Sequence, residues 1–249
     1  MRALLLCAGA GSRLAPLTDV CPKPLVTVAG VPLVLRQILA LKAAGVTSFV
    51  INVAHAGALL RATLGDGSAW GVHITWSVEG ETISQALETL GGIVKALPLL
   101  TAHGDDAFIV AAGDVVTDYP WERLCARGAA LKAEGALAHL VLVENPDYHP
   151  SGDMTLREGL VSREVKTHTF ASFGVYRAAL FEGLTPARAS LFPWLDAAVA
   201  QGRLTGEVYD GLWLNVGDFR ELARARERLK PLGGWPPCAK GELDAADIV

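Results

Sequence analysis

The chain has 249 residues, of which 51% are hydrophobic and 19% are charged, so it can bury a large core and differs from a disordered chain. The formal net charge of −4 argues against sequence-independent nucleic-acid binding, which needs a basic face. No apolar run reaches the roughly 20 residues that span a bilayer, so we expect no membrane insertion. The apolar run at the amino terminus is too short for a signal peptide.

Four cysteines are spread widely along the chain, without a CxxC pair or a Cys/His cluster: Cys7, Cys21, Cys125 and Cys238. This spacing is typical of reduced thiols, and it predicts a cytoplasmic protein. With an acidic overall charge, the protein is expected to meet an anionic substrate through a few local cations.

Short runs rich in Val, Ile and Leu alternate with amphipathic stretches, as in strands buried between two layers of helices. In chain order the pattern predicts strands at 3–7, 49–53, 72–78, 107–111 and 138–143. Between and after them it predicts helices at 32–44, 59–64, 86–97, 121–134, 191–200 and 218–229. Turn signals within 144–176 predict hairpin strands laid over the sheet.

We therefore predict one doubly wound α/β/α domain over residues 1–230, with a mostly parallel mixed sheet and a small antiparallel insertion. Residues 231–249 hold Pro, Gly and acidic residues with little periodicity, so a loosely held tail is expected there.

A glycine-rich segment, Ala8 to Lys23, directly follows the first predicted strand. Gly9 and Gly11 lack a Cβ atom, so backbone N–H groups there can approach an anion closely. A lone GxG is weak evidence, because a tight strand-to-helix turn has the same sequence. Arg13 and the Pro22-Lys23-Pro24 segment add two cations to the same loop, which favours phosphate binding.

This loop is neither a GxxxxGK[ST] P-loop nor a GxGxxG fingerprint, since position 14 is Leu. The run LLLCAGAGSRLAPLTDVCPKPLVTVAGVPL resembles the signature of sugar-1-phosphate nucleotidyltransferases, LAAGxGxRxxPLTxxxPKPLxPVxGxPL. The resemblance implies a Rossmann-like nucleotidyltransferase fold. It also implies that the triphosphate lies in the loop formed by Ala8, Gly9, Gly11, Ser12 and Arg13, and that Lys23 contacts the transferring phosphates.

Asp114 follows the apolar strand FIVAA in a Gly-Asp pair, at the edge where open α/β sheets bind ligands. A hard carboxylate oxygen there suits Mg²⁺, although Asp114 could instead cap the next segment. The resemblance implies a second metal ligand from a late W-x-D-V-G-T segment, which here reads Trp213-Leu214-Asn215-Val216-Gly217-Asp218. Asn215 supplies only a neutral oxygen, and Asp218 is a candidate partial substitute for the missing carboxylate. The alternative is that Asn215 is a buried turn residue and no metal ligand.

Further segments look like the loops of N-acetylmuramic acid 1-phosphate uridylyltransferases: 64–68, 79–81, 87–93 and HLVLVENPDYHPSGDMTL. Two departures are a small insertion at 82–86 and Leu90 in place of a Gly. The likeness places Glu79 near the nucleobase. It places Ala112, Gly152, Asp153 and Ser172 on the sugar side, with Ala112 where an Asn is expected.

The resemblance as a whole implies an Mg²⁺-dependent enzyme of cell-wall sugar recycling that joins a nucleoside triphosphate, UTP in that group, to a sugar 1-phosphate and releases pyrophosphate. A different acceptor or base is one alternative, such as mannose 1-phosphate with GTP or a phosphocholine cytidylyltransferase. A nucleotide-sugar sensor that has lost its chemistry is the non-enzymatic alternative.

Overall fold

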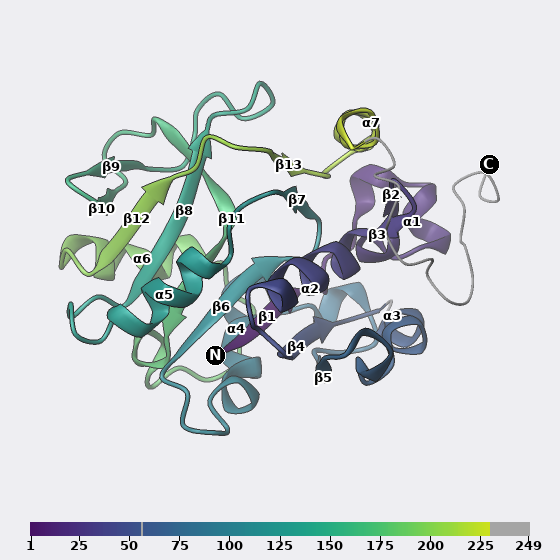
Figure 1. Ribbon diagram of the computed structural model, residues 1–249, viewed down its shortest axis with the longest axis horizontal. Helices are drawn as coiled ribbons and strands as arrows, with labels where there is room; N and C mark the ends of the chain where they lie inside the picture. Colours follow the sequence, from purple (N-terminus) through teal and green to yellow (C-terminus); the bar gives the residue numbers. More distant parts are fainter. Residues whose placement is uncertain (56, 230–249) are drawn as a thin grey trace.

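The computed structural model describes residues 1–55 and 57–229, and the expected loose tail at 231–249 lies outside the described residues. A nine-stranded sheet runs through the centre of the molecule in the order β5-β4-β1-β6-β11-β8-β12-β10-β9 (Figure 1). Its strands are β1 (Arg2–Leu6), β4 (Ser48–Val53), β5 (His73–Val78), β6 (Ala107–Ala112), β8 (Ala138–Glu144), β9 (Thr155–Arg157), β10 (Leu160–Ser162), β11 (His168–Arg177) and β12 (Leu204–Val208).

The strand directions place the carboxyl ends of most strands at one edge of this sheet. β5, β4, β1 and β6 are parallel neighbours, and β8 is parallel to β12. β11 is antiparallel to both β6 and β8, so β8 and β12 run in the same direction as β1. The carboxyl ends of six strands therefore meet at one edge, which is where α/β sheets bind ligands. The expected mostly parallel mixed sheet is confirmed.

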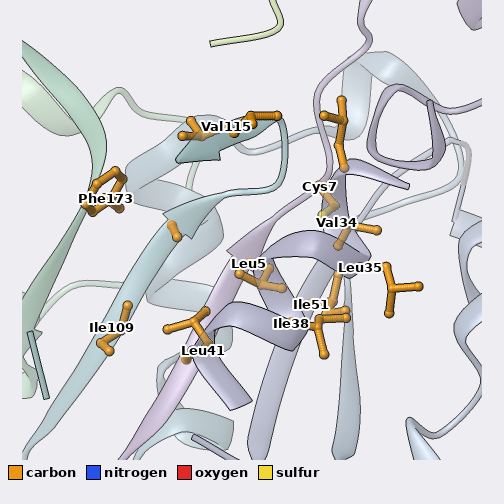
Figure 2. Packing of buried hydrophobic residues seen from close by; sticks show 14 of the residues in the cluster. Leu5, Cys7, Val34, Leu35, Ile38, Leu41, Ile51, Ile109, Val115 and Phe173 are labelled. Atoms are coloured by element: carbon orange, nitrogen blue, oxygen red, sulfur yellow. The ribbon is translucent and has the colours of Figure 1, made fainter. Parts of the chain in front are cut away.

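Helices cover both faces of the sheet: α2 (Leu33–Ala43), α3 (Gly57–Leu64), α4 (Glu88–Leu100), α5 (Glu122–Ala130), α6 (Leu191–Ala200) and α7 (Phe219–Arg228). Successive strand residues point to opposite faces, so Leu5 lies in one buried cluster and Leu4 in the other. The first cluster includes residues of α2, α3, α5 and α7, and the second includes residues of α4 and α6. Figure 2 shows Leu5 and Ile51 of the sheet beside Ile38 and Leu41 of α2, with Ile109 farther to the side on β6. The predicted α/β/α layering is confirmed.

Short elements complete the fold. They are α1 (Leu17–Val20), the hairpin β2 (Thr27–Val28) and β3 (Val31–Pro32), and the antiparallel pair β7 (Val115–Thr117) and β13 (Trp213–Asn215). Turns of 3₁₀ helix occupy Ser12–Leu14, Lys23–Leu25, Ser68–Trp70, Ile83–Gln85 and Ala178–Phe181.

The expectation for 144–176 is partly wrong. β9 and β10 do form a hairpin, but it extends the edge of the main sheet. β11, expected as part of that hairpin layer, is a ten-residue strand in the middle of the sheet between β6 and β8. Polar and small residues interrupt the apolar pattern of β11, so the sequence does not predict a buried central strand there. Gly174 is needed there, because a Cβ atom would lie 2.7 Å from the His139 carbonyl oxygen.

Candidate active site

The glycine loop leaves the end of β1 at the ligand-binding edge. Gly11 has φ of +66°, and a Cβ atom on it would lie 3.0 Å from Thr18 Cγ2 and 3.1 Å from Lys23 Cβ. The Thr18 hydroxyl donates to the Gly11 carbonyl at 3.0 Å. A Cβ atom on Gly9, in contrast, would meet nothing within 4 Å. Gly11 thus allows the loop to pack tightly beside Lys23, while the backbone at Gly9 is open to an approaching anion.

Lys23 and Asp114, expected from separate motifs, form a direct ion pair in the structure. Lys23 Nζ lies 2.5 Å from Asp114 Oδ2, and the two side chains are only 11% and 23% exposed. β6 lies beside β1 in the sheet, so Asp114, two residues after β6, comes close to the loop after β1. Gly113 permits this approach, because a Cβ atom there would lie 2.6 Å from Cys7 Sγ.

Asn215 joins the same site through the pairing of β13 with β7. Asn215 is opposite Val115, and the Val216 N–H donates to the Asp114 carbonyl at 3.0 Å. The Asn215 Oδ1 atom is buried, and it has no hydrogen-bond partner among the described residues. An unpaired buried amide oxygen is costly, so this oxygen is a candidate ligand for a cation at Asp114.

Asp218, the suggested substitute, has a structural role. It caps α7, with its Oδ1 accepting the Glu221 N–H at 2.9 Å. Within the described residues, no group of three or more His, Cys, Asp or Glu side chains is arranged to hold a metal ion. The candidate metal ligands are therefore the Asp114 carboxylate and the Asn215 amide oxygen.

Arg13 lies against the segment that follows Asn215. A Cβ atom on Gly217 would be 3.1 Å from an Arg13 Nη atom, so this glycine makes room for the guanidinium group. Tyr148 lies within electrostatic reach of the same groups: partial burial raises its pKa to about 12, the Glu221 and Asp114 carboxylates add to the rise, and Arg13 opposes it. One site is thus formed by the glycine loop together with Arg13, Lys23, Asp114 and Asn215.

Cys7 lies beneath this site but has the wrong chemistry for a nucleophile. Burial raises the pKa of its thiol, and the negative charge of Asp114 raises it further, so the thiol stays protonated at neutral pH. Cys7, Cys21 and Cys125 are free thiols in the structure, and Cys238 lies outside the described residues.

Glu79 occupies an unexpected environment for a base-contacting residue. It is 8% exposed. Its Oε1 accepts a hydrogen bond from Asn52 Nδ2 at 2.6 Å, and its Oε2 accepts one from the Leu87 N–H at 2.7 Å. Asn52 Oδ1 in turn accepts from the Cys7 N–H at 2.7 Å. Sequence reasoning missed Asn52, although a lone amide within the apolar run SFVINV is itself a signal. The role of Glu79 beside the nucleobase stays a prediction.

The residues expected on the sugar side lie around the start of β11. Phe173, next to Ser172, pairs with Ala111, next to Ala112. Ser172 has φ of +65° at the point where the register of β11 against β8 shifts. Ser172 and Ala112 are thereby brought close together, while their contact with a sugar stays a prediction.

Gly152 and Asp153 are held near the same strand. Asp153 Oδ2 accepts the Phe170 N–H at 3.0 Å, and its Oδ1 lies 3.1 Å from His149 Nε2. Gly152 is buried with φ of +60°, and a Cβ atom there would collide with the Asn145 side chain at 2.6 Å. Both residues therefore lie near the start of β11, and a role for them in sugar binding stays a prediction.

A hollow of about 600 Å³ lies at the same edge. Two of the stretches singled out in the sequence contribute to its lining, at 143–148 and at 213–214, although neither stretch by itself predicts a cavity. The hollow is formed by the segments after β8 and β12, the start of β11, and α7, which are far apart in the sequence. Its lining residues include Asn145, Tyr148, His168, Asp210, Trp213 and Arg224. The Trp213 indole N–H donates to the Ala171 carbonyl at 2.9 Å, which connects this hollow to Ser172.

None of the helices in the described part of the chain is long and apolar enough to cross a membrane.

Comparisons with known proteins identify the family to which this chain is similar. The family model described as Nucleotidyl transferase matches residues 2–165. N-acetylmuramate alpha-1-phosphate uridylyltransferase of Neisseria meningitidis serogroup B is 42% identical over 240 residues, which cover 94% of this chain and 100% of that protein. Mannose-1-phosphate guanyltransferase of Gibberella zeae is 30% identical over 89% of this chain, which spans 62% of that protein.

The solved structure of a putative glucose-1-phosphate thymidylyltransferase from Bacillus anthracis, in complex with a sucrose, superposes with a TM-score of 0.81. It is 20% identical, and the match covers 96% of this chain and 98% of that one. At this identity the likeness concerns the fold, and it confirms the α/β architecture.

Proposed function

Because this chain belongs to the nucleotidyl transferase family, we propose that it transfers a uridylyl group from UTP to N-acetylmuramic acid 1-phosphate. The products are UDP-N-acetylmuramic acid and pyrophosphate. The observation that carries the reaction is the meeting of Lys23, Asp114 and Asn215 beside the glycine loop. The choice of base and acceptor rests on the Neisseria relative, and it makes the protein an enzyme of cytoplasmic cell-wall sugar recycling.

In this reaction an oxygen of the sugar phosphate attacks the α-phosphorus of UTP in line. The bond from that phosphorus to the bridging oxygen breaks, and pyrophosphate carries away the electron pair. Arg13 and the backbone N–H groups of the loop at Ala8, Gly9, Gly11 and Ser12 stabilise the charge that grows on pyrophosphate. Lys23 stabilises the transferring phosphoryl group. Catalysis of this kind depends on position and charge, so no covalent enzyme intermediate is needed.

The candidate metal ligands suit Mg²⁺. Asp114 and Asn215 both offer hard oxygen atoms, and the Asn215 Oδ1 atom is buried without a partner among the described residues. Bound there, Mg²⁺ supplies positive charge that lets two anionic reactants approach each other. The remaining coordination positions are expected to come from phosphate oxygens and water, because Mg²⁺ binds few protein ligands in such sites.

The acceptor sugar is proposed to lie beside Ala112, Gly152, Asp153 and Ser172, next to the hollow lined by Trp213. Ala112 cannot donate a hydrogen bond from its side chain, so polar groups of the hollow have to supply contacts to the sugar. The base is proposed to lie towards the loop after Glu79, with Glu79 holding that loop in place.

Pyrophosphate release tests the proposal, with UTP and N-acetylmuramic acid 1-phosphate beside glucose, mannose and N-acetylglucosamine 1-phosphates and beside GTP and CTP. We expect the highest kcat/KM for the first pair. Release with mannose 1-phosphate and GTP would instead assign the activity of the Gibberella relative to this chain. Tight nucleotide binding without pyrophosphate release from any pair would reject an enzyme and favour a sensor.

A further inference from the structure

The Lys23 ammonium and a divalent metal ion need the same carboxylate. Lys23 Nζ lies 2.5 Å from Asp114 Oδ2, and carboxylate oxygens bind Mg²⁺ at about 2.0–2.1 Å. A dication at Asp114 would therefore sit within a few ångströms of a positive charge. Asp114 is also the only carboxylate of the two candidate ligands, since Asn215 is neutral.

We propose that Lys23 is a built-in counter-cation of Asp114, which keeps free metal out of the site until the triphosphate arrives. The proposal rests on the proposed function for the identity of the nucleotide. Its physical basis is the local charge. Lys23 neutralises Asp114, and the Arg13 guanidinium beside Gly217 adds a further positive charge. The nearby carboxylate of Asp218 has one oxygen committed to capping α7.

The packing of Lys23 favours this pairing. Pro22 and Pro24 on either side are buried, and the Lys23 Cβ atom packs against Gly11. These contacts fix the backbone and leave mainly the outer part of the side chain free to move. Lys23 can then turn its ammonium from the Asp114 carboxylate to a phosphate without moving the loop.

The triphosphate changes the balance because it brings several negative charges. Phosphate oxygens offer Lys23 a second partner and offer the metal additional ligands. The Asp114 carboxylate is then released to the metal, so metal and nucleotide should bind cooperatively. The neutral Asn215 makes this dependence stronger, because a second carboxylate would attract the metal without any nucleotide.

Mn²⁺ binding to the full chain without nucleotide, measured from the electron paramagnetic resonance signal of free Mn²⁺, tests the proposal without requiring turnover. We expect the wild type to bind Mn²⁺ weakly and Lys23→Met to bind it more tightly, by about tenfold or more. The repulsion between Mn²⁺ and a unit positive charge within about 4 Å is larger than the free energy that corresponds to a tenfold change in affinity. Lys132→Met removes the same charge from an exposed side chain and should bind Mn²⁺ as the wild type does. Adding Asp114→Asn to Lys23→Met should abolish the gain.

Asn215→Asp provides a second, independent variant that keeps Lys23, and it should also bind Mn²⁺ without nucleotide. With the α,β-methylene analogue of UTP present, the wild type should bind Mn²⁺ at least as tightly as Lys23→Met. Equal Mn²⁺ affinity of wild type and Lys23→Met without nucleotide would overturn the proposal, as would weak binding by both variants. The metal measurement needs no acceptor, so failure of the muramic acid assignment alone would leave its result intact.

Discussion

A chain of three hydrogen bonds connects the end of β1, where the glycine loop begins, to the segment that follows β5. The Cys7 N–H donates to Asn52 Oδ1, Asn52 Nδ2 donates to Glu79 Oε1, and the Leu87 N–H donates to Glu79 Oε2. Both ends of the chain are backbone donors, so the two side chains between them must provide three acceptors and one donor. Asn and Glu together meet this requirement.

The requirement predicts the outcome of isosteric substitutions. In Glu79→Gln the new NH₂ group faces either the Leu87 N–H or the Asn52 amide group. Rotating either side-chain amide by 180° leaves two N–H donors facing each other at another point of the hydrogen-bond chain. One buried donor then lacks an acceptor, so the free energy of unfolding should fall by about 1–3 kcal/mol. Asn52→Asp sets two carboxylates against each other and should cost at least as much.

The double variant Asn52→Asp with Glu79→Gln restores the pattern, because the new Asp accepts at both ends and the new Gln donates to it. We expect the double variant to be more stable than the two single effects predict, by about 0.5–3 kcal/mol of coupling. Urea unfolding followed by far-ultraviolet circular dichroism measures these differences. Glu81→Gln, at an exposed neighbouring position, is the matched control.

Two results would refute this reasoning. One is a Glu79→Gln variant as stable as Glu81→Gln, and the other is a double variant in which the two losses simply add. If the chain also positions the loops, both single variants should raise KM for the nucleotide, and the double variant should recover it. Unchanged KM in the single variants would limit the chain to a role in stability.

Three further outcomes are expected. Asp114→Asn should lower kcat for pyrophosphate release by orders of magnitude, with an unfolding midpoint near that of the wild type; normal turnover would contradict the metal role. Gly11→Ala forces a side chain into φ of +66° against Thr18, so it should lose about 1–2 kcal/mol of stability and bind nucleotide more weakly, as calorimetry can measure; unchanged binding would show that the loop tolerates a Cβ atom. The Tyr148 phenol, with a pKa near 12, should ionise at a higher pH than the usual value of about 10, and the difference in absorbance between the wild type and Tyr148→Phe measures this titration. The unfolded chain releases the phenol proton at lower pH than the folded chain does. The contribution of Tyr148 to the free energy of unfolding is therefore lost as pH rises from about 10 to about 12.

The layers of the fold could be predicted from the sequence because each buried strand is a continuous apolar run. Strands such as β6 and β8 were therefore found to within a residue or two. β11 could not be found in this way, since His168, Ser172 and Gly174 interrupt its apolar pattern. Its place between β6 and β8 depends on partners that are distant in the sequence, and local patterns do not contain that information.

The same limit applies to the site. The cationic loop and Asp114 could each be recognised from local sequence, but their contact depends on β1 and β6 being neighbours in the sheet. The sequence predicts a site role for Glu79 and none for its partner Asn52, because the hydrogen bond between them joins β4 to the residue after β5. Motifs thus predict which residues carry the chemistry, and strand order decides which of them meet.

Strand order also explains how the protein could accommodate a neutral residue at the candidate metal site. β13 pairs with β7 through the backbone, so this pairing brings residue 215 beside Asp114 whether its side chain is charged or neutral. An Asp at 215 would add a second carboxylate next to the Lys23 and Asp114 pair and favour metal without nucleotide. The Asn keeps an oxygen at the same point with less charge, which makes Lys23 an adequate counter-cation for Asp114 alone. On this proposal, the neutral side chain of Asn215 makes metal binding depend on the nucleotide.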